Sequence, residues 1–274
     1  MCLQCLVIKN LNNDQVVWMC QVCWNLGVIH ARAEDFISAQ FGFKWCQNFS
    51  QWATEAKEEF EYKAGFYYLT AKVCGSEGMT EEDYEILKQC EKKSVTDALS
   101  CLKIEMLLRS RHWTELSEVL RTTTSLKFES LAEIVLRASE EIPLEIYRLV
   151  LDKLTENEFT NDEFDILRFA GLYRGLTICA LLQFPNDLCH FHSAVKMIKS
   201  SFGGYPSEET AWLCSTALEM GRQAAENEGE WGKAGEWTEM AMNLVYLIST
   251  EGEEDRMIRN HLQESVQTYI ECSD

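Results

Sequence analysis

Only three prolines, Pro143, Pro185 and Pro206, interrupt the 274 residues of this chain. Proline ends or kinks a helix, because its ring clashes with the preceding turn and it has no amide hydrogen to donate. Few segments combine β-branched residues with the turn dipeptides that bound strands. Helices therefore have little to interrupt them, and we expect an all-α fold.

Apolar residues recur at helical spacing along the chain, and hydrophobic residues make up 46% of it, which is ample for a core. The pattern predicts about twelve antiparallel helices joined by short polar breaks. The clearest breaks are 74–78 and 201–206, and neither resembles a long linker, so we expect one domain over residues 1–274. The expected helices lie near 14–30, 34–53, 56–74, 81–109, 112–122, 128–139, 143–156, 161–182, 187–202, 207–227, 231–249 and 253–271.

Two of these helix starts carry capping groups. Thr80 with Asp83, and Ser207 two residues ahead of Glu209, place acceptors and acidic groups where a first turn leaves amide donors free. We therefore expect helices to begin near 81 and 207.

Two distant helix pairs share one arrangement of large and small residues, which indicates an internal repeat. In both pairs, a glycine lies nine residues after a tryptophan, and a second tryptophan lies three residues after a later small residue. The turn between the two helices differs by two residues. The shared positions are Trp18, Cys20, Gly27, Gly42 and Trp45 in the first pair, and Trp212, Cys214, Gly221, Ala234 and Trp237 in the second.

Packing between antiparallel helices explains this arrangement. A glycine such as Gly27 or Gly221 opens a hole that an aromatic side chain fills, at a helix-propensity cost of about 1 kcal/mol. Ala234, Trp237 and Ala241 then share one face at i, i+3 and i+7, as the second helix of a tetratricopeptide (TPR) unit requires. Stacking covers the flanks of such units and creates a concave surface, so we expect a TPR-like α-solenoid that binds proteins.

The same reasoning separates the tryptophans into two groups. Trp113 follows His112 at a break between helices, and Trp231 follows a turn rich in Glu and Gly. We expect both to be exposed and to be candidate partner-binding residues, because exposed tryptophans often anchor interfaces. Core packing is expected for those in or beside the repeated unit, Trp18, Trp24, Trp45, Trp212 and Trp237.

Four cysteines near the start of the chain form the strongest competing signal. Cys2-x-x-Cys5 and Cys20-x-x-Cys23 are separated by fourteen residues, which is near the spacing of a zinc site. The flanking residues lack the Gly or Pro of zinc knuckles, and the second pair lies inside an amphipathic segment. We therefore favour buried thiols, expect no metal or cofactor, and keep a zinc-dependent domain as an alternative.

The chain offers no convincing catalytic group, and we expect no enzyme activity. Cys189 and His190 lie beside Asp187, but adjacent residues on a helix point about 100° apart, so a nucleophile and a base would not face each other there. Paired carboxylates such as Glu253-Glu254 fall at expected helix ends, where they favour the helix dipole. There is no Gly-rich phosphate loop or nucleophile elbow.

A formal charge of −19 argues against direct nucleic-acid binding, because the average field repels phosphates. No stretch approaches the ~18 apolar residues that a membrane span needs, and the first residues lack the basic region of a secretory signal. The twelve cysteines mostly lie among apolar residues, as in Ile178-Cys179 and Leu213-Cys214. We therefore expect an intracellular protein with reduced core thiols and no membrane contact.

Three segments of the chain share a common pattern with known sequences. They are Trp18 to Trp45 with the block Trp24-Asn25-Leu26-Gly27-Val28, Leu131 to Tyr147, and Trp212 to Leu247 with Glu236-Trp237 and Ala241-Met242-Asn243-Leu244. In matching order they resemble a family of meiosis-specific helical-repeat scaffolds, called Zip-four or Spo-twenty-two in fungi and plants, and testis-expressed protein eleven in mammals. One departure is Leu218-Glu219, where the family often has Trp-Asn or a related pair.

The resemblance covers nearly the entire chain. Because family members are usually much longer, the chain is similar to their C-terminal half, to a divergent short member or to an incomplete gene model. The resemblance implies a scaffold in the nucleus, on meiotic chromosomes, that acts in recombination, crossover formation and synapsis. Its implied partners are a pair related to XPF-type and ERCC-type nuclease subunits, together with synaptonemal complex proteins. Contact with nucleic acid would then belong to the partners.

A general TPR adaptor, such as a co-chaperone or trafficking subunit, is the other alternative. It would need a clamp of Lys and Arg lining its groove to bind a carboxylate, and basic residues are sparse on the expected inner helices.

Overall fold

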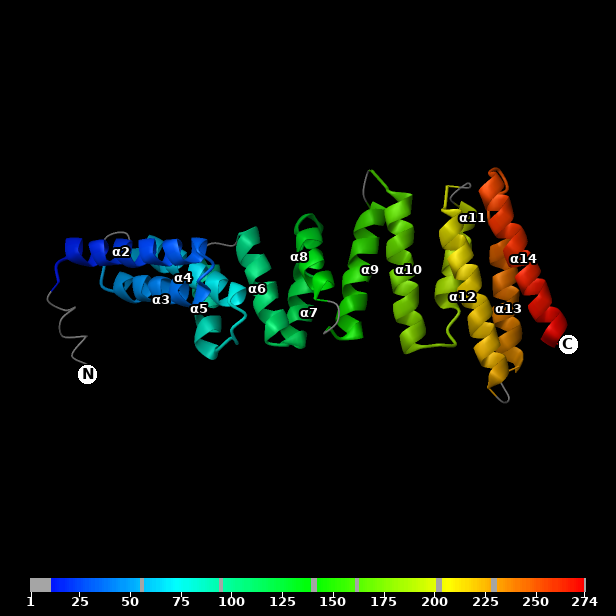
Figure 1. Ribbon diagram of the computed structural model, residues 1–274, viewed down its shortest axis with the longest axis horizontal. Coiled ribbons are helices and arrows are strands. Elements are labelled where there is room, and N and C mark those ends of the chain that lie inside the picture. Colours follow the sequence, from blue (N-terminus) through cyan, green and yellow to red (C-terminus); the bar gives the residue numbers. More distant parts are fainter. Residues whose placement is uncertain are drawn as a thin grey trace. The chain divides into compact units, whose positions relative to one another are not determined.

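The computed structural model describes residues 11–54, 57–93, 96–138, 142–160, 163–200, 204–227 and 231–273. All the regular structure in these ranges is α-helical, which confirms the expected all-α class (Figure 1). The thirteen helices of the described residues are α2 (Asn13–Arg32), α3 (Phe36–Ser50), α4 (Lys57–Cys74), α5 (Glu81–Lys93), α6 (Asp97–Arg109), α7 (Trp113–Thr122), α8 (Ser125–Arg137), α9 (Leu144–Thr160), α10 (Ile166–Gln183), α11 (Cys189–Ser200), α12 (Ser207–Glu226), α13 (Trp231–Val245) and α14 (Glu253–Ser273).

The helix expected over 81–109 is wrong, because it consists of two helices, α5 and α6. Thr96 caps α6, since its hydroxyl oxygen accepts a hydrogen bond from the amide of Leu99. Lys92 and Lys93 end α5, and Asp97 begins α6, so both termini carry the charge that their dipole favours. The cap and the charge change are the sequence signals for this break.

The two caps expected from the sequence differ in outcome. Thr80 and Asp83 do mark the start of α5, where a carboxylate oxygen of Asp83 accepts from the amide and the hydroxyl of Thr80 at 2.7 and 2.8 Å. Ser207 is instead the first residue of α12, and the capping position is held by Pro206, which makes no side-chain cap.

The chain divides into two compact units, Met1–Ile146 and Tyr147–Asp274. In unit 1, consecutive helices from α2 to α7 pack together, and α2 also contacts α4, α4 contacts α6, and α6 contacts α8. Unit 2 has the same kind of pattern: α12 packs on α13 and α13 on α14, while α10 contacts α12, α11 contacts α13, and α12 contacts α14. The expectation of a single repeat domain stays a prediction.

Each unit has its own buried side chains. In unit 1, Leu69 of α4, Ile86 of α5 and Leu102 of α6 belong to one cluster, and α2, α3 and α4 share two smaller ones. In unit 2, a single cluster joins α10 to α14 and includes Phe191 and Trp237, whose rings meet edge to face at 5.0 Å. Burial of these apolar side chains is what holds the helices of each unit together.

A buried ion pair joins α4 to α5 within unit 1. Asp83 has no exposed surface, and its carboxylate accepts from the Lys72 ammonium at 2.6 Å and from the Tyr68 hydroxyl at 3.0 Å. Burial acts to raise the pKa of Asp83, but the hydrogen bonds from Lys72, Thr80 and Tyr68 outweigh it and hold the pKa below its ordinary value. The turn between α4 and α5 is therefore fixed by a fully partnered buried charge.

One described helix, α10, is long and apolar enough to cross a membrane by length and composition alone. The expectation that no stretch approaches this limit is therefore wrong. Phe169, Ala170 and Tyr173 of α10 lie in the core of unit 2, and a core helix passes the same test.

Candidate functional site

The two helix pairs of the sequence repeat are α2 with α3 and α12 with α13. Both pairs lie side by side along their lengths and share extensive contacts (Figure 1). They also carry most of the residues that the sequence singles out.

Glycines bring α2 and α3 into close contact. A Cβ atom on Gly42 would lie 2.6 Å from the backbone nitrogen of Gly27, and one on Gly27 would lie 2.7 Å from the ring of Phe43. The ring of Phe43 also meets Trp24 at 5.4 Å and Tyr67 of α4 at 5.6 Å between centroids. Phe43, rather than the expected Trp45, therefore fills the space that the glycines open.

The close approach in the second pair involves one glycine. A Cβ atom on Gly221 would lie 3.3 Å from the Cβ of Trp237 and 3.5 Å from the Ala234 carbonyl and the Thr238 hydroxyl oxygen. Ala234, Trp237 and Ala241 are all buried, with Trp237 only 1% exposed. Gly221 therefore does lie against the face that these three residues form.

Contacts between the helices match residues of α3 and α13 differently from the sequence spacing, by three residues. The Cys20 thiol donates to the carbonyl of Cys46 at 3.8 Å, and the Cys214 thiol donates to the carbonyl of Ala241 at 3.5 Å. By these contacts Ala241 corresponds to Cys46, so Trp237 corresponds to Gly42 and not to Trp45. The sequence spacing that equated Trp45 with Trp237 therefore does not describe equivalent positions in space.

The tryptophans of the two helix pairs differ in burial. Core packing is confirmed for Trp237 and is wrong for Trp18 and Trp45, which are 64% and 41% exposed. Trp24 and Trp212 are half-buried: Trp24 packs edge-on against Phe43 and Tyr67, and the Arg174 guanidinium lies 4.6 Å from the Trp212 ring centroid. Periodicity identifies the helices, but the neighbouring helix decides which tryptophan it covers.

The two tryptophans expected to be exposed begin helices. Trp113 is the first residue of α7 and is half-buried, so its expected exposure is only partial. Trp231 is the first residue of α13 and is 65% exposed, which confirms that expectation.

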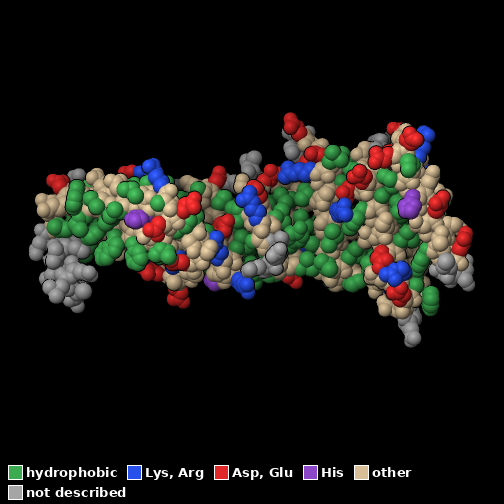
Figure 2. All heavy atoms as spheres, in the orientation of Figure 1, with side chains coloured by type: hydrophobic (Ala, Val, Ile, Leu, Met, Phe, Trp, Pro, Cys, Tyr) green, Lys and Arg blue, Asp and Glu red, His purple; other side chains and the backbone are tan. Residues whose placement is uncertain are grey.

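Large apolar side chains occupy the outer face of α3. Ile37, Phe41 and Trp45 are spaced at i, i+4 and i+8, and Phe41 is 65% exposed; we call these three residues the α3 outer stripe. Residues on the opposite side of the helix, such as Ala39 and Phe43, are buried. Figure 2 shows hydrophobic side chains gathered over α2 and α3.

The outer face of α2 carries a similar set. Trp18 and Ile29 are exposed on the side away from the buried Val16 and Cys20, and Asn25 is exposed between them. Asn25 therefore lies at the surface of the helix pair and not in its packing.

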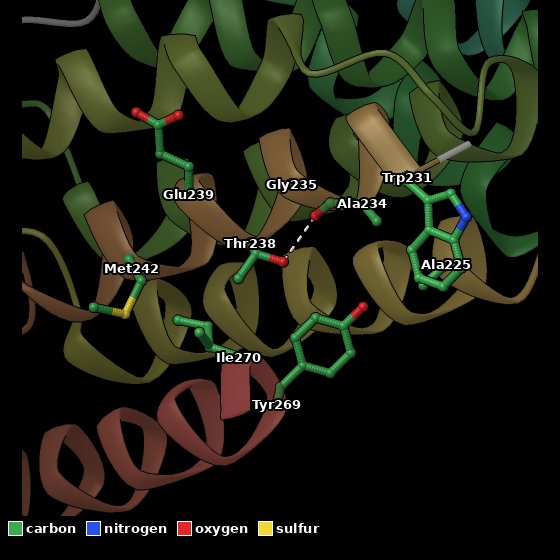
Figure 3. Close-up of a pocket in the computed structure, with 9 residues that line it drawn as sticks. All are labelled: Ala225, Trp231, Ala234, Gly235, Thr238, Glu239, Met242, Tyr269 and Ile270. Atoms are coloured by element: carbon green, nitrogen blue, oxygen red, sulfur yellow. Dashed lines mark hydrogen bonds between the residues drawn. The ribbon is translucent and has the colours of Figure 1, made fainter. Parts of the chain in front are cut away.

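A pocket of about 420 Å³ lies among α12, α13 and α14 of unit 2 (Figure 3). Trp231, Gly235 and Glu239 follow one another along α13, and Tyr269 and Ile270 reach in from α14. The Thr238 hydroxyl in its wall donates to the carbonyl of Ala234 at 2.8 Å. The lining is completed by Ala225 and Met242. This pocket combines the exposed Trp231 with the buried Ala234 of the repeat.

The described half of the candidate zinc site lies on a helix. Cys20 is buried in α2 with its thiol on the carbonyl of Cys46, and burial raises the pKa of the half-buried Cys23. Among the residues that the structure describes, no group of three or more His, Cys, Asp or Glu is placed to hold a metal ion. Cys2 and Cys5 lie outside those residues.

Cys189 and His190 begin α11. The carboxylate of Asp187 accepts from the Cys189 amide at 2.9 Å, and its hydrogen bond and charge raise the pKa of the Cys189 thiol. Burial, with the nearby Arg148, lowers the pKa of His190. A raised thiol pKa disfavours the thiolate that nucleophilic catalysis requires.

Comparison of the chain with protein-family models, with curated proteins and with solved structures gives no significant match.

Proposed function

We propose that this chain is a protein-interaction scaffold whose helix pairs stack as TPR-like repeats of an α-solenoid. Within each unit, helices contact the next helix and also the next but one, and this pattern is typical of stacked helical hairpins. The pairs α2–α3 and α12–α13 support the same arrangement, because Cys20 and Cys214 each donate to a carbonyl of the second helix.

The observation that carries the proposal is the α3 outer stripe. Ile37, Phe41 and Trp45 place three large apolar side chains in a row on the surface of one helix, where they are costly to leave in water. Contiguous exposed apolar side chains on a folded protein mark interaction sites. A protein that binds other proteins through helix faces accounts for them.

We propose that the partners are proteins of meiotic chromosomes in the nucleus. The resemblance implies a pair of the XPF type and ERCC type and synaptonemal complex proteins, in crossover formation and synapsis. The charge of −19 supports a role through protein partners, because it disfavours direct contact with nucleic acid.

The alternative of a general TPR adaptor has less support. A clamp for a partner's carboxylate needs basic side chains that are available in the groove. Lys72 is paired with Asp83 in the interior, Lys44 lies 2.6 Å from Glu82, and Lys103 lies 2.9 Å from Glu91. These lysines already bind carboxylates of the same chain.

The test is capture of partners from meiotic cells by the tagged full chain, followed by mass spectrometry. We expect recombination and synaptonemal complex proteins with the wild type, and their loss with Phe41→Glu. Met257→Glu is the matched control, because Met257 is an equally exposed apolar residue on α14. Circular dichroism checks that both variants are folded.

Two outcomes would overturn the proposal. One is recovery of chaperones or transport proteins without recombination proteins. The other is unchanged capture by Phe41→Glu.

A further inference from the structure

The pocket among α12, α13 and α14 has one aromatic end and one acidic end. Trp231, Gly235 and Glu239 are spaced at i, i+4 and i+8, so the lining extends over two turns of α13, about 12 Å. In Figure 3, Trp231 lies at one end of the labelled set and Glu239 lies with Met242 at the other, with Gly235 between them. Tyr269 faces the Trp231 end, and the Glu239 carboxylate points outward from the other labelled side chains. A ligand that fills this pocket therefore meets apolar rings first and a carboxylate two turns away.

The charged residues around the pocket indicate that its ligand is positively charged. Acidic residues outnumber basic residues on each of α12, α13 and α14. Arg222 of α12 is engaged by Glu219 and Glu226, and among the described residues Glu239 forms no ion pair. Glu239 is exposed at the pocket, so a positive charge brought by a ligand can pair with it.

The size of the pocket and the residues that line it favour a protein segment over a lone ion as the ligand. A pocket of about 420 Å³ falls within the range of binding pockets, and its walls are mainly aromatic, aliphatic and small side chains. An ion alone would leave Trp231 and Ile270 in water. A segment with an apolar side chain covers them and gains the energy of that burial.

We propose that this pocket binds a segment of a partner protein that carries an apolar side chain and, about two helical turns away, a lysine or arginine. The apolar side chain packs between Trp231 and the α14 residues Tyr269 and Ile270, and the basic side chain pairs with Glu239. The proposal rests on the proposed function, that the chain binds proteins, and names the chemistry of one partner.

Two glycines of α13 supply a matched pair of variants. Gly235 lines the pocket, and a Cβ atom there would meet no other atom within 4 Å. Gly232 has the same open space but does not line the pocket. Gly235→Leu therefore fills the pocket, Gly232→Leu adds the same side chain outside it, and both replace glycine by a better helix former.

The experiment selects peptides from a random peptide library displayed on phage, with the full chain as bait and the Gly235→Leu chain as counter-bait. We expect peptides with a Lys or Arg and an apolar residue. A labelled selected peptide then binds Gly235→Leu at least about tenfold more weakly than the wild type and binds Gly232→Leu equally well. Glu239→Gln and added salt weaken binding only while the peptide keeps its basic residue.

Three results would overturn the inference: no peptide sensitive to Gly235→Leu, sensitive peptides that lack basic residues, or equal binding when the basic residue is replaced by norleucine. The proposed function is tested separately, because it depends on Phe41 in unit 1. If the wild-type chain captures no meiotic partners but binds peptides as described, the proposed function alone is rejected. If it captures meiotic partners through Phe41 but binds no such peptide, this inference alone is rejected.

Discussion

Gly42 shows how a single hydrogen atom sets the distance between two helices. The atoms that a methyl group would meet there belong to the backbone of Gly27, which cannot rotate away as a side chain can. The two helices must therefore separate to admit it, and the packing of Phe43 against Trp24 would be lost with them.

We expect Gly42→Ala to lower the free energy of unfolding by about 1–3 kcal/mol, as overpacking does. Gly235→Ala is the control, because it is also a helical glycine but faces open space, and it should raise stability by up to about 1 kcal/mol. Urea unfolding followed by circular dichroism measures both. Equal stability of Gly42→Ala and the wild type would show that the helices are not in close contact at this point.

Asp83 is a second single residue on which a turn depends. Asp83→Asn leaves the Lys72 ammonium, itself nearly buried, without its counter-charge, so we expect a loss of about 3–5 kcal/mol in the free energy of unfolding. Glu85→Gln breaks an exposed ion pair with Lys88 that water screens, so it should lower the free energy of unfolding far less. Denaturant titration of the two variants distinguishes these costs, and similar losses would contradict the buried pair.

The same carboxylate makes stability depend on pH. Its pKa is lower in the folded chain than in the unfolded chain, so its contribution is present above the unfolded value of about 4 and is lost as pH falls through the folded value. We expect the stability difference between the wild type and Asp83→Asn to shrink below about pH 4. A constant difference from pH 7 to pH 3 would argue against the lowered pKa.

At the level of helices, periodicity and caps predict most of the described elements, and the failures have local causes. Periodicity alone does not reveal the break between α5 and α6, because the apolar spacing continues through it, and only the capping residue Thr96 marks it. A helix begins where its first free amides find an acceptor, so a capping residue sets the boundary where the apolar spacing gives no signal.

Thr96 therefore offers a test of the start of α6. We expect Thr96→Ala to lower the free energy of unfolding by about 1 kcal/mol, because it removes the acceptor of the Leu99 amide. Thr96→Ser keeps a hydroxyl acceptor and should retain most of that stability. Thermal unfolding of the two variants measures the difference in stability. Thr96 is exposed, so neither substitution removes packing. Equal stabilities would mean that the cap does not hold the helix start.

The helix pairs show which part of helix packing the sequence does not predict. Gly27, Gly42 and Gly221 could be identified from sequence as packing positions, because small residues at helical spacing have few other uses. The partner of each glycine could not be identified in the same way. A shift of three residues along a helix preserves the amphipathic pattern almost unchanged, and it exchanges Trp45 for Gly42 as the residue equivalent to Trp237.

For the molecule as a whole, contacts divide the chain into two units, and each unit contains buried apolar clusters. One cluster of unit 2 consists of residues from α10 to α14 and from the segments between these helices. A chain segment with its own apolar core can fold without the rest.

We therefore expect a fragment of residues 142–274 to keep a helical circular dichroism spectrum and a cooperative thermal transition. The full chain is the reference for helix content per residue. A fragment that binds hydrophobic dyes and melts without a transition would show that unit 2 needs unit 1.

The all-α class, most helix positions and the acidic charge follow from the amino-acid sequence, because they depend on local propensity, spacing and composition. The exposed positions of Trp18 and Trp45, the buried charge of Asp83 and the pocket beside Trp231 do not. Each depends on which side chains a neighbouring helix brings to the same place. That choice rests on the sum of packing over the whole contact between helices, so a pattern within one helix cannot reveal it.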